Sequence, residues 1–213
     1  MENMIRKMSP LEEKTAHLLV EAGENAHWEY SASLQCPQGP LLEFRTEKLD
    51  NQANPSTSVL DKMSQWPNFV LHHNHLSGQS LSFADWRGVS MFFNEIYAHC
   101  NDGTVYYGRV LDKVKVLHII DNLKDDIEVK SENILFKYTN NNELASFFRK
   151  EVICRYLKIK GYVEYGYFWG NLSISHQKVL NLNIQNIVSI GGLGNAYEDL
   201  VQCAALNLSD TYP

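Results

Sequence analysis

Three histidines stand within four positions at the end of a mostly apolar run, Phe69 to His75. Side chains alternate across a β-strand, so His73 and His75 share one face of this predicted strand and His72 points the other way. Two imidazoles separated by a single residue can bind one divalent cation. The strand is therefore predicted to carry two metal ligands, and His72 is given no role.

A carboxylate that could complete this site follows ten residues after His75. Asp85 lies in the first turn of a helix predicted to begin at or just after Ser82, where the helix dipole favours an acid. Catalytic zinc sites commonly combine three His or carboxylate ligands with a fourth position for water. Ser82 and Asp85 also fit a purely structural capping box, and this alternative stays open. Coupled to the histidines, Asp85 is interpreted as the third ligand.

The region before the histidines predicts a helix and a hairpin. Ser9 caps a helix that carries proline in its first turn, and Gly23 marks its predicted end. Between Glu29 and Cys36 apolar and polar residues alternate, which predicts a strand with Glu29 at its start. Residues 41–45 can return as its hairpin partner. These elements would form one edge of a sheet that also contains the histidine strand.

The region after Ser82 predicts a helix and further strands. Apolar residues recur at helical spacing from Trp86 to Ile96. Two β-rich runs, 104–110 and 114–120, predict a second hairpin, which brings the sheet to about five strands. The aromatic stretch 162–169 is interpreted as core, and an exposed protein-binding surface is the alternative. The predicted fold class is α+β, with a mixed sheet flanked by helices.

The second half of the chain is predicted to be more helical than the first. A polar segment at 126–142 is interpreted as a connection, 143–160 as a helix and 197–206 as a second helix. We therefore expect a domain at 1–125 that carries the site, and a helical C-terminal extension at 126–213 packed on or beside it.

Composition and charge disfavour several functional classes. The 213 residues are 44% apolar, enough for a sizeable core, and carry a formal charge of -6. No Lys/Arg block is present, so nucleic acid is not an expected partner. The sequence shows no signal-peptide pattern and no apolar run of bilayer length, so we expect a cytoplasmic protein that does not bind membranes. The four cysteines are far apart and predict reduced, buried thiols.

The motif His73-Asn74-His75, followed by Ser82 and Asp85, resembles the HxH and SxxD signature of the JAMM/MPN+ zinc metallopeptidases. The likeness is greatest to the bacterial and phage-type branch, where the motif continues as HNH-P-S-G. Leu76 replaces that proline, so the turn must be formed in another way here. The resemblance covers roughly residues 9–125 and implies a cytidine-deaminase-like mixed sheet flanked by helices.

The resemblance also implies roles for these residues. His73, His75 and Asp85 would hold Zn²⁺, whose bound water ionises near neutral pH and supplies a hydroxide nucleophile. Ser82 would stabilise the oxyanion of the tetrahedral intermediate.

A glutamate in or just before a strand is a further family feature, and Glu29 occupies a similar place. It would accept the proton of the metal-bound water and pass it to the leaving amine. Position favours Glu29 for this role, and the other carboxylates that could take it are Glu24, Glu43 and Glu47.

Members of this family cleave peptide or isopeptide bonds, typically next to ubiquitin or ubiquitin-like tails, and often dimerise. The resemblance therefore implies a zinc-dependent hydrolase with a protein or peptide substrate, and leaves a homodimer as an open expectation. One alternative is a catalytically weak or inactive MPN-like scaffold that binds a partner through residues 126–213. A second is an HNH nuclease, but there the three residues are dispersed. Gly191 to Gly194 are interpreted as a turn rather than a phosphate loop.

Overall fold

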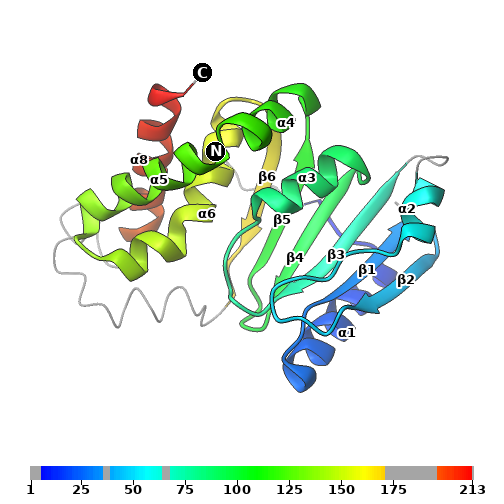
Figure 1. Cartoon of the computed structure of the whole chain (residues 1–213). Helices are drawn as coiled ribbons and strands as arrows, with labels where there is room; N and C mark the ends of the chain where they lie inside the picture. Colours follow the sequence, from blue (N-terminus) through cyan, green and yellow to red (C-terminus); the bar gives the residue numbers. More distant parts are fainter. Residues whose placement is uncertain (1–5, 36–38, 64–67, 171–195, 213) are drawn as a thin grey trace.

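A computed structural model describes residues 6–35, 39–63, 68–170 and 196–212. Within this part of the chain, six strands form one mixed sheet and seven helices pack around it (Figure 1). The elements are α1 (Pro10–Ala26), β1 (Tyr30–Gln35), β2 (Leu41–Thr46), α2 (Thr57–Met63), β3 (Phe69–His75), α3 (Phe83–Met91), β4 (Glu95–Cys100), β5 (Val105–Val110), α4 (Lys113–Asn122), α5 (Lys124–Thr139), α6 (Asn142–Ile159), β6 (Val163–Phe168) and α8 (Ala196–Thr211).

The strand order across the sheet is β2-β1-β3-β4-β5-β6. Strands β3 and β4 run parallel, and every other neighbouring pair runs antiparallel. The predicted α+β class and the β1–β2 hairpin are confirmed. The sheet has six strands rather than about five, because β4 and β6 both join it whereas residues 114–120 do not.

Two elements after Asp85 differ from their prediction. Residues 114–120 form helix α4, in which Val116, Ile119 and Ile120 are buried at helical spacing and Asp112 caps the first turn. Strand β5 pairs instead with β4 and β6. The helical spacing predicted from Trp86 runs to Ile96, which lies in β4. Tertiary packing overrides the β-propensity of the first segment and the periodicity of the second.

The segment predicted as a polar connection at 126–142 is also helical. In α5 the residues Ile127, Ser131, Ile134 and Leu135 form a buried stripe at helical spacing. The stripe is narrow and the other faces are polar, so the segment has the composition of a loop although it packs against α6 and α8. The helix predicted at 197–206 is confirmed within α8.

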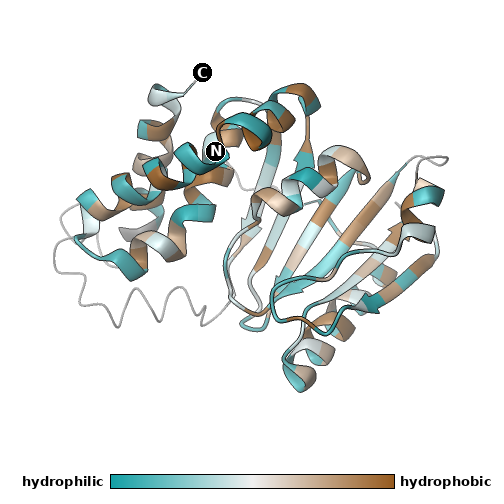
Figure 2. Ribbon diagram, in the orientation of Figure 1, coloured by the Kyte–Doolittle hydropathy of each residue, from teal (hydrophilic) through white to brown (hydrophobic). Residues whose placement is uncertain are grey.

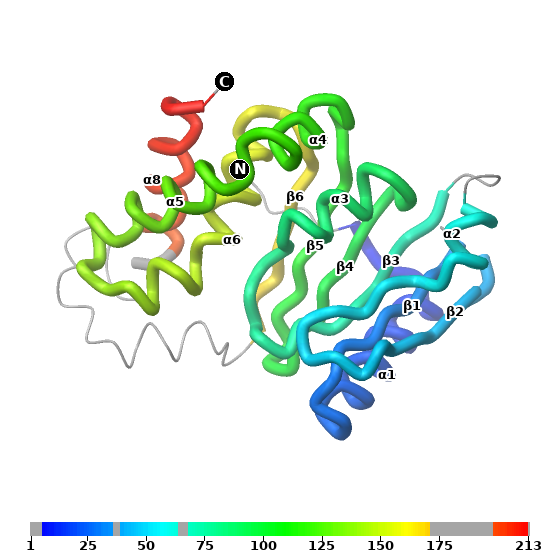
Figure 3. Tube along the Cα trace, in the orientation of Figure 1, coloured from blue at the N-terminus to red at the C-terminus, as the bar shows by residue number. Residues whose placement is uncertain are grey.

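Helices cover the sheet on both faces. Helix α1 packs on β1, β3 and β4 from one face, and α3 and α6 pack on the other (Figure 3). Helices α5, α6 and α8 form a group beyond the β6 edge (Figure 1). Hydrophobic residues, brown in Figure 2, run along the strands and the inner sides of the helices. One core cluster joins residues from both sides of the predicted boundary at residue 125.

Helix α1 begins as predicted, with a complete capping box between Ser9 and Glu12, but it ends at Ala26 instead of Gly23. Gly23 has another role: a Cβ atom there would lie 2.1 Å from the side-chain nitrogen of Asn74. The glycine therefore lets α1 approach β3 closely.

Three further expectations concern the cysteines, the turn at Gly191 to Gly194 and membrane-spanning segments. Of the cysteines, Cys100 and Cys154 are free and buried, and Cys203 is free and half-buried. Cys36 and the turn at Gly191 to Gly194 lie outside the described residues. Among the described helices, none combines the length and apolar character needed to cross a bilayer.

Candidate metal centre

Strand β3 presents its histidines to opposite faces of the sheet, as its alternation predicts. Leu71 belongs to the core beneath α3, and His73 and His75 share its face. Val70 belongs to the core beneath α1, on the face of His72. His73 and His75 are only 5% and 6% exposed, so the paired imidazoles are largely withdrawn from solvent.

Asp85 reaches the two histidines from the first turn of α3. Its backbone N–H donates to Ser82 Oγ at 3.2 Å, and its Oδ2 accepts from Ser82 N at 2.6 Å and from Ser82 Oγ at 2.7 Å. This is a complete capping box. The capping interpretation and the ligand interpretation are both compatible with this geometry, because the box fixes a carboxylate that also faces the imidazoles.

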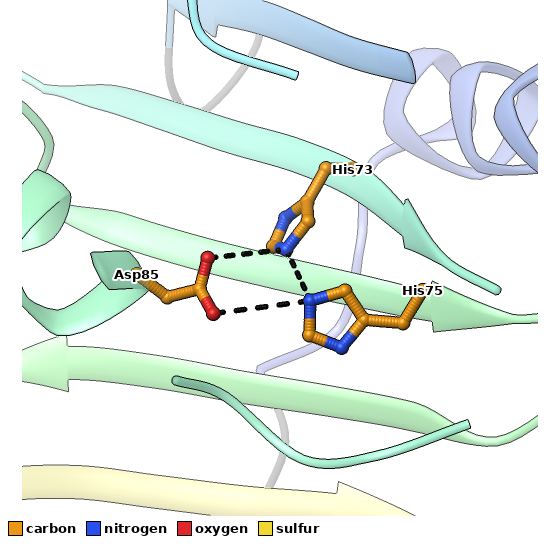
Figure 4. Close-up of side chains that lie close together, drawn as sticks. All are labelled: His73, His75 and Asp85. Atoms are coloured by element: carbon orange, nitrogen blue, oxygen red, sulfur yellow. Dashed lines mark hydrogen bonds and ion pairs between the residues drawn. The ribbon is translucent and has the colours of Figure 1, made fainter. Parts of the chain in front are cut away.

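The three side chains converge on one point (Figure 4). The distance between His73 Nε2 and His75 Nε2 is 2.7 Å, that from His73 Nε2 to Asp85 Oδ1 is 3.3 Å, and that from His75 Nε2 to Asp85 Oδ2 is 3.8 Å. Ligand atoms of a tetrahedral zinc site lie about 3.3 Å apart when each bond is about 2.0 Å. The observed distances bracket that value, so the group could hold a metal ion.

The charge states of Asp85 and His75 suit metal binding, whereas the Asp85 carboxylate favours a proton on His73 that a metal ion would have to displace. Burial would raise the pKa of Asp85, but the His73 charge and hydrogen bonds lower it well below its usual range. Burial lowers the pKa of His75 to about 4, with repulsion from His73 as a further cause. Burial also lowers the pKa of His73, but the Asp85 carboxylate more than compensates and the net shift is upward. At neutral pH Asp85 is ionised and His75 is neutral, as metal ligands must be.

A backbone contact fixes which nitrogen of His75 is available. His75 Nδ1 lies 2.7 Å from the carbonyl oxygen of Gln79, so this nitrogen must carry the proton and donate it. The lone pair then sits on Nε2, which faces Asp85 and His73. Carbonyl groups commonly orient metal-binding imidazoles in this way.

The turn after His75 forms without the proline of the related signature. Gly78 adopts a left-handed φ of 69°, and its N–H donates to the His75 carbonyl at 3.3 Å. The hydroxyl of Tyr106 on β5 donates to the Gly78 carbonyl at 3.0 Å. A glycine conformation and a buried tyrosine thus replace the fixed φ that proline supplies.

The rest of this loop is held from the C-terminal half of the chain. The Ser80 and Tyr165 hydroxyl oxygens are 2.7 Å apart, and Cys154 Sγ donates to the Leu81 carbonyl at 3.2 Å. All four residues are buried. Sequence analysis missed Cys154 and Tyr165 as supports of the site, since no local pattern links residues more than 70 positions apart.

Glu29 lies beside the histidines through the register of β1. Ser31 pairs with His73 in the antiparallel ladder, so two residues earlier Glu29 comes opposite His75. Glu29 is 8% exposed, and burial raises its pKa to about 7. A carboxyl group with this pKa can both accept and release a proton at neutral pH.

The three alternative carboxylates lie elsewhere. Glu43 accepts from the backbone N–H of Ser56 at 2.8 Å, Glu47 binds Asn54, and Glu24 is exposed on α1. None of the three lines the cavity that contains Glu29 and the histidines.

This cavity has a volume of about 490 Å³. Glu29, Ser82 and the three candidate ligands line it, and α6 contributes Lys150, which sequence analysis did not consider. The remaining wall is largely apolar and includes Leu60, Leu71, Phe92, Phe93 and Ile96. The cavity therefore combines polar chemistry with a surface that suits the apolar part of a ligand.

Fold and site together define an α+β protein with a candidate metal centre on the third strand of a mixed sheet. No protein-family model, no curated protein and no solved structure matches the chain.

Proposed function

We propose that this protein is a JAMM/MPN-like zinc hydrolase that cleaves peptide or isopeptide bonds. The observation that carries the proposal is the convergence of His73, His75 and Asp85 in a cavity that also contains the buried carboxyl group of Glu29. Two imidazoles and one carboxylate form a donor set that zinc takes in catalytic sites. When bound, zinc supplies a Lewis acid and a water of lowered pKa.

Glu29 is the proton carrier in this proposal. Its carboxylate accepts a proton from the attacking water, and the resulting carboxylic acid then donates that proton to the leaving amine. Both steps are favourable near neutral pH because burial raises the Glu29 pKa to about 7. Proton transfer of this kind contributes about 10²- to 10⁴-fold to rates.

Ser82 primarily orients Asp85 in this proposal. Its hydroxyl donates to Asp85 Oδ2 at 2.7 Å and thereby fixes which carboxylate oxygen faces each imidazole. The same hydroxyl can stabilise an oxyanion only when it turns away from that carboxylate. The substrate class implied by the family resemblance is a peptide tail, including tails of ubiquitin-like proteins.

The experiment combines metal analysis with hydrolysis. We expect about one zinc ion per chain, and cleavage of a peptide mixture or of a ubiquitin–lysine isopeptide that a chelator abolishes and added zinc restores. Glu29→Gln should retain zinc and lose about 10²- to 10⁴-fold in kcat/KM. Glu24→Gln, exposed on α1 and outside the cavity, is the matched control and should keep full activity. A wild-type protein that binds no added zinc, or a fully active Glu29→Gln variant, contradicts the proposal.

A further inference from the structure

Helix α6 contributes a cation to the cavity of the candidate metal centre. Lys150 lines this cavity together with His75. It lies four residues before Cys154, whose thiol contacts the Leu81 carbonyl, so both residues share the helix face that meets the loop after β3. Burial dominates the pKa values of Glu29 and His75, and the Lys150 charge acts on both as a further lowering influence.

The ammonium group of Lys150 has no partner within the described part of the chain. It is half-buried, and no hydrogen bond or ion pair joins it to another described residue. The other two cations nearby on α6 are paired: Arg149 with Glu132 at 2.7 Å and Arg155 with Glu151 at 2.8 Å. Because no described residue accepts from this ammonium group at the cavity wall, its charge is available to a ligand.

When the proposed centre holds a metal ion, the acids that line the cavity do not neutralise the charge of Lys150. Glu29 and Asp85 carry at most two negative charges, which a divalent ion balances. Asp50 is exposed on the loop after β2. Arg87, the other lining cation, is paired with Asp121 outside the cavity. Lys150 therefore remains as an unneutralised positive charge at the wall of the cavity.

We propose that Lys150 binds a carboxylate of the substrate, so that the protein selects acidic peptides or peptides with a free C-terminus. This inference rests on the proposed function, because it assumes a peptide in the cavity. A single ammonium is a point charge suited to one carboxylate. Phosphate would call for further donors, and at the start of α3 the capping box engages the backbone N–H groups of Ser82 and Asp85.

The test uses four hexapeptides of one apolar sequence: a C-terminal acid, its amide, and two amides that carry an internal Glu or Gln. Binding is measured by calorimetry with the full-length protein before and after chelation, and cleavage is measured in parallel. We expect a carboxylate peptide to bind about 10-fold or more tightly than its neutral match, since a charge-assisted hydrogen bond is lost in the neutral one. A preference for the C-terminal acid identifies the terminus as the ligand, and one for Glu identifies the side chain.

Three variants assign this preference to Lys150. Lys150→Met should abolish it without changing the affinity for neutral peptides, and Lys150→Arg should retain most of it. Lys158→Met, on α6 but outside the cavity, is the matched control and should behave as wild type.

The outcomes separate the two proposals. Equal binding of acidic and neutral peptides, a preference that survives in Lys150→Met, or no binding of any peptide overturns the role of Lys150. A Lys150-dependent preference without cleavage leaves that role intact and overturns the proposed hydrolysis. Cleavage without any preference for acidic peptides leaves the proposed hydrolysis intact and overturns the role of Lys150.

Discussion

Both faces of β3 place histidine beside an acid from a helix capping box, but the histidines of the α3 face line the cavity and His72 on the α1 face does not. On each face, a capping box at the start of a helix directs its acid toward histidine from this strand: Glu12 of α1 toward His72, and Asp85 of α3 toward His73 and His75. On the α1 face, both ring nitrogens of His72 contact other protein side chains. His72 Nδ1 lies 2.9 Å from His99 Nε2, and the fully buried His72 ring stacks on Tyr97.

On the α3 face the corresponding nitrogens meet at the wall of a cavity. His73 and His75 turn Nε2 toward each other and toward Asp85, and the three side chains could hold a metal ion. Neighbouring histidines and an acid occur on both faces, so these features alone do not distinguish the two. What distinguishes the two faces is access, because His73 and His75 line the cavity and His72 does not.

The largest effect that would test this comparison is on zinc affinity. We expect His75→Ala to weaken zinc binding by about 10³-fold or more, since even indirect supports of a ligand contribute about 10- to 100-fold. His72→Leu should leave zinc affinity unchanged, although it lowers stability. Competition with a chromophoric chelator measures both. Equal losses in the two variants would mean that the faces are not functionally distinct.

The next effect concerns the α1 face of β3 and the pH dependence of its contribution to stability. Glu12 is buried, and Arg6 binds it together with His72. Burial raises the pKa of Glu12, but these partners lower it well below its usual range. Its charge therefore stabilises the fold above the ordinary Glu pKa of about 4.3, and this contribution is lost as pH falls below that value toward the folded pKa.

Glu12→Gln should accordingly reduce the free energy of unfolding by about 2 kcal/mol at pH 7. The difference from wild type should shrink in urea titrations repeated at about pH 3. Zinc affinity at pH 7 should not change. A variant difference that grows in acid would show that the carboxylate is not stabilised in its charged form.

A smaller effect separates the two capping boxes. Ser82→Ala should weaken zinc binding by about 10-fold, because the hydroxyl orients Asp85, and should cost about 1 kcal/mol of stability as a lost cap. Ser9→Ala is the matched control, since it removes the equivalent cap beside Glu12. It should cost similar stability and leave zinc binding intact. Loss of stability alone in Ser82→Ala would favour a purely structural role.

The smallest effect concerns the loop after β3, which contacts the C-terminal half of the chain. Tyr165→Phe removes the hydroxyl that contacts Ser80 and Glu151. We expect a loss of about 1 kcal/mol in stability and a few-fold loss in zinc affinity, measured by thermal denaturation and chelator competition. Tyr138→Phe, whose hydroxyl accepts from Asn207 at an exposed position, is the control and should leave zinc binding unchanged.

Local patterns were sufficient for the elements that carry the candidate site. Alternation placed His73 and His75 on one face of β3, and the Ser82 capping pattern located the start of α3. Glu29 was chosen from its place at the start of the predicted strand and from the family resemblance, whereas its position opposite His75 depends on the pairing of β1 with β3. The α+β class followed from the same signals, whereas the family resemblance and the boundary at residue 125 stay predictions.

The parts that sequence analysis missed depend on distant contacts. Residues 114–120 are β-rich, yet burial against other elements makes them helical in α4. Lys150 and Tyr165 reach the cavity or its loop from segments 68 or more residues beyond Ser82. No local periodicity encodes such contacts, so only the folded arrangement identifies these residues.

The dependence of the loop on Tyr165 has a consequence for biosynthesis. The hydroxyl that binds Ser80 is translated 85 residues after it, a delay of roughly 4 to 17 s at about 5 to 20 residues per second. A nascent chain that has emerged only as far as α4 carries the two imidazoles and their acid but lacks the clamp from β6 and α6. The loop beside the candidate metal centre would then gain its last supporting contacts only late in synthesis.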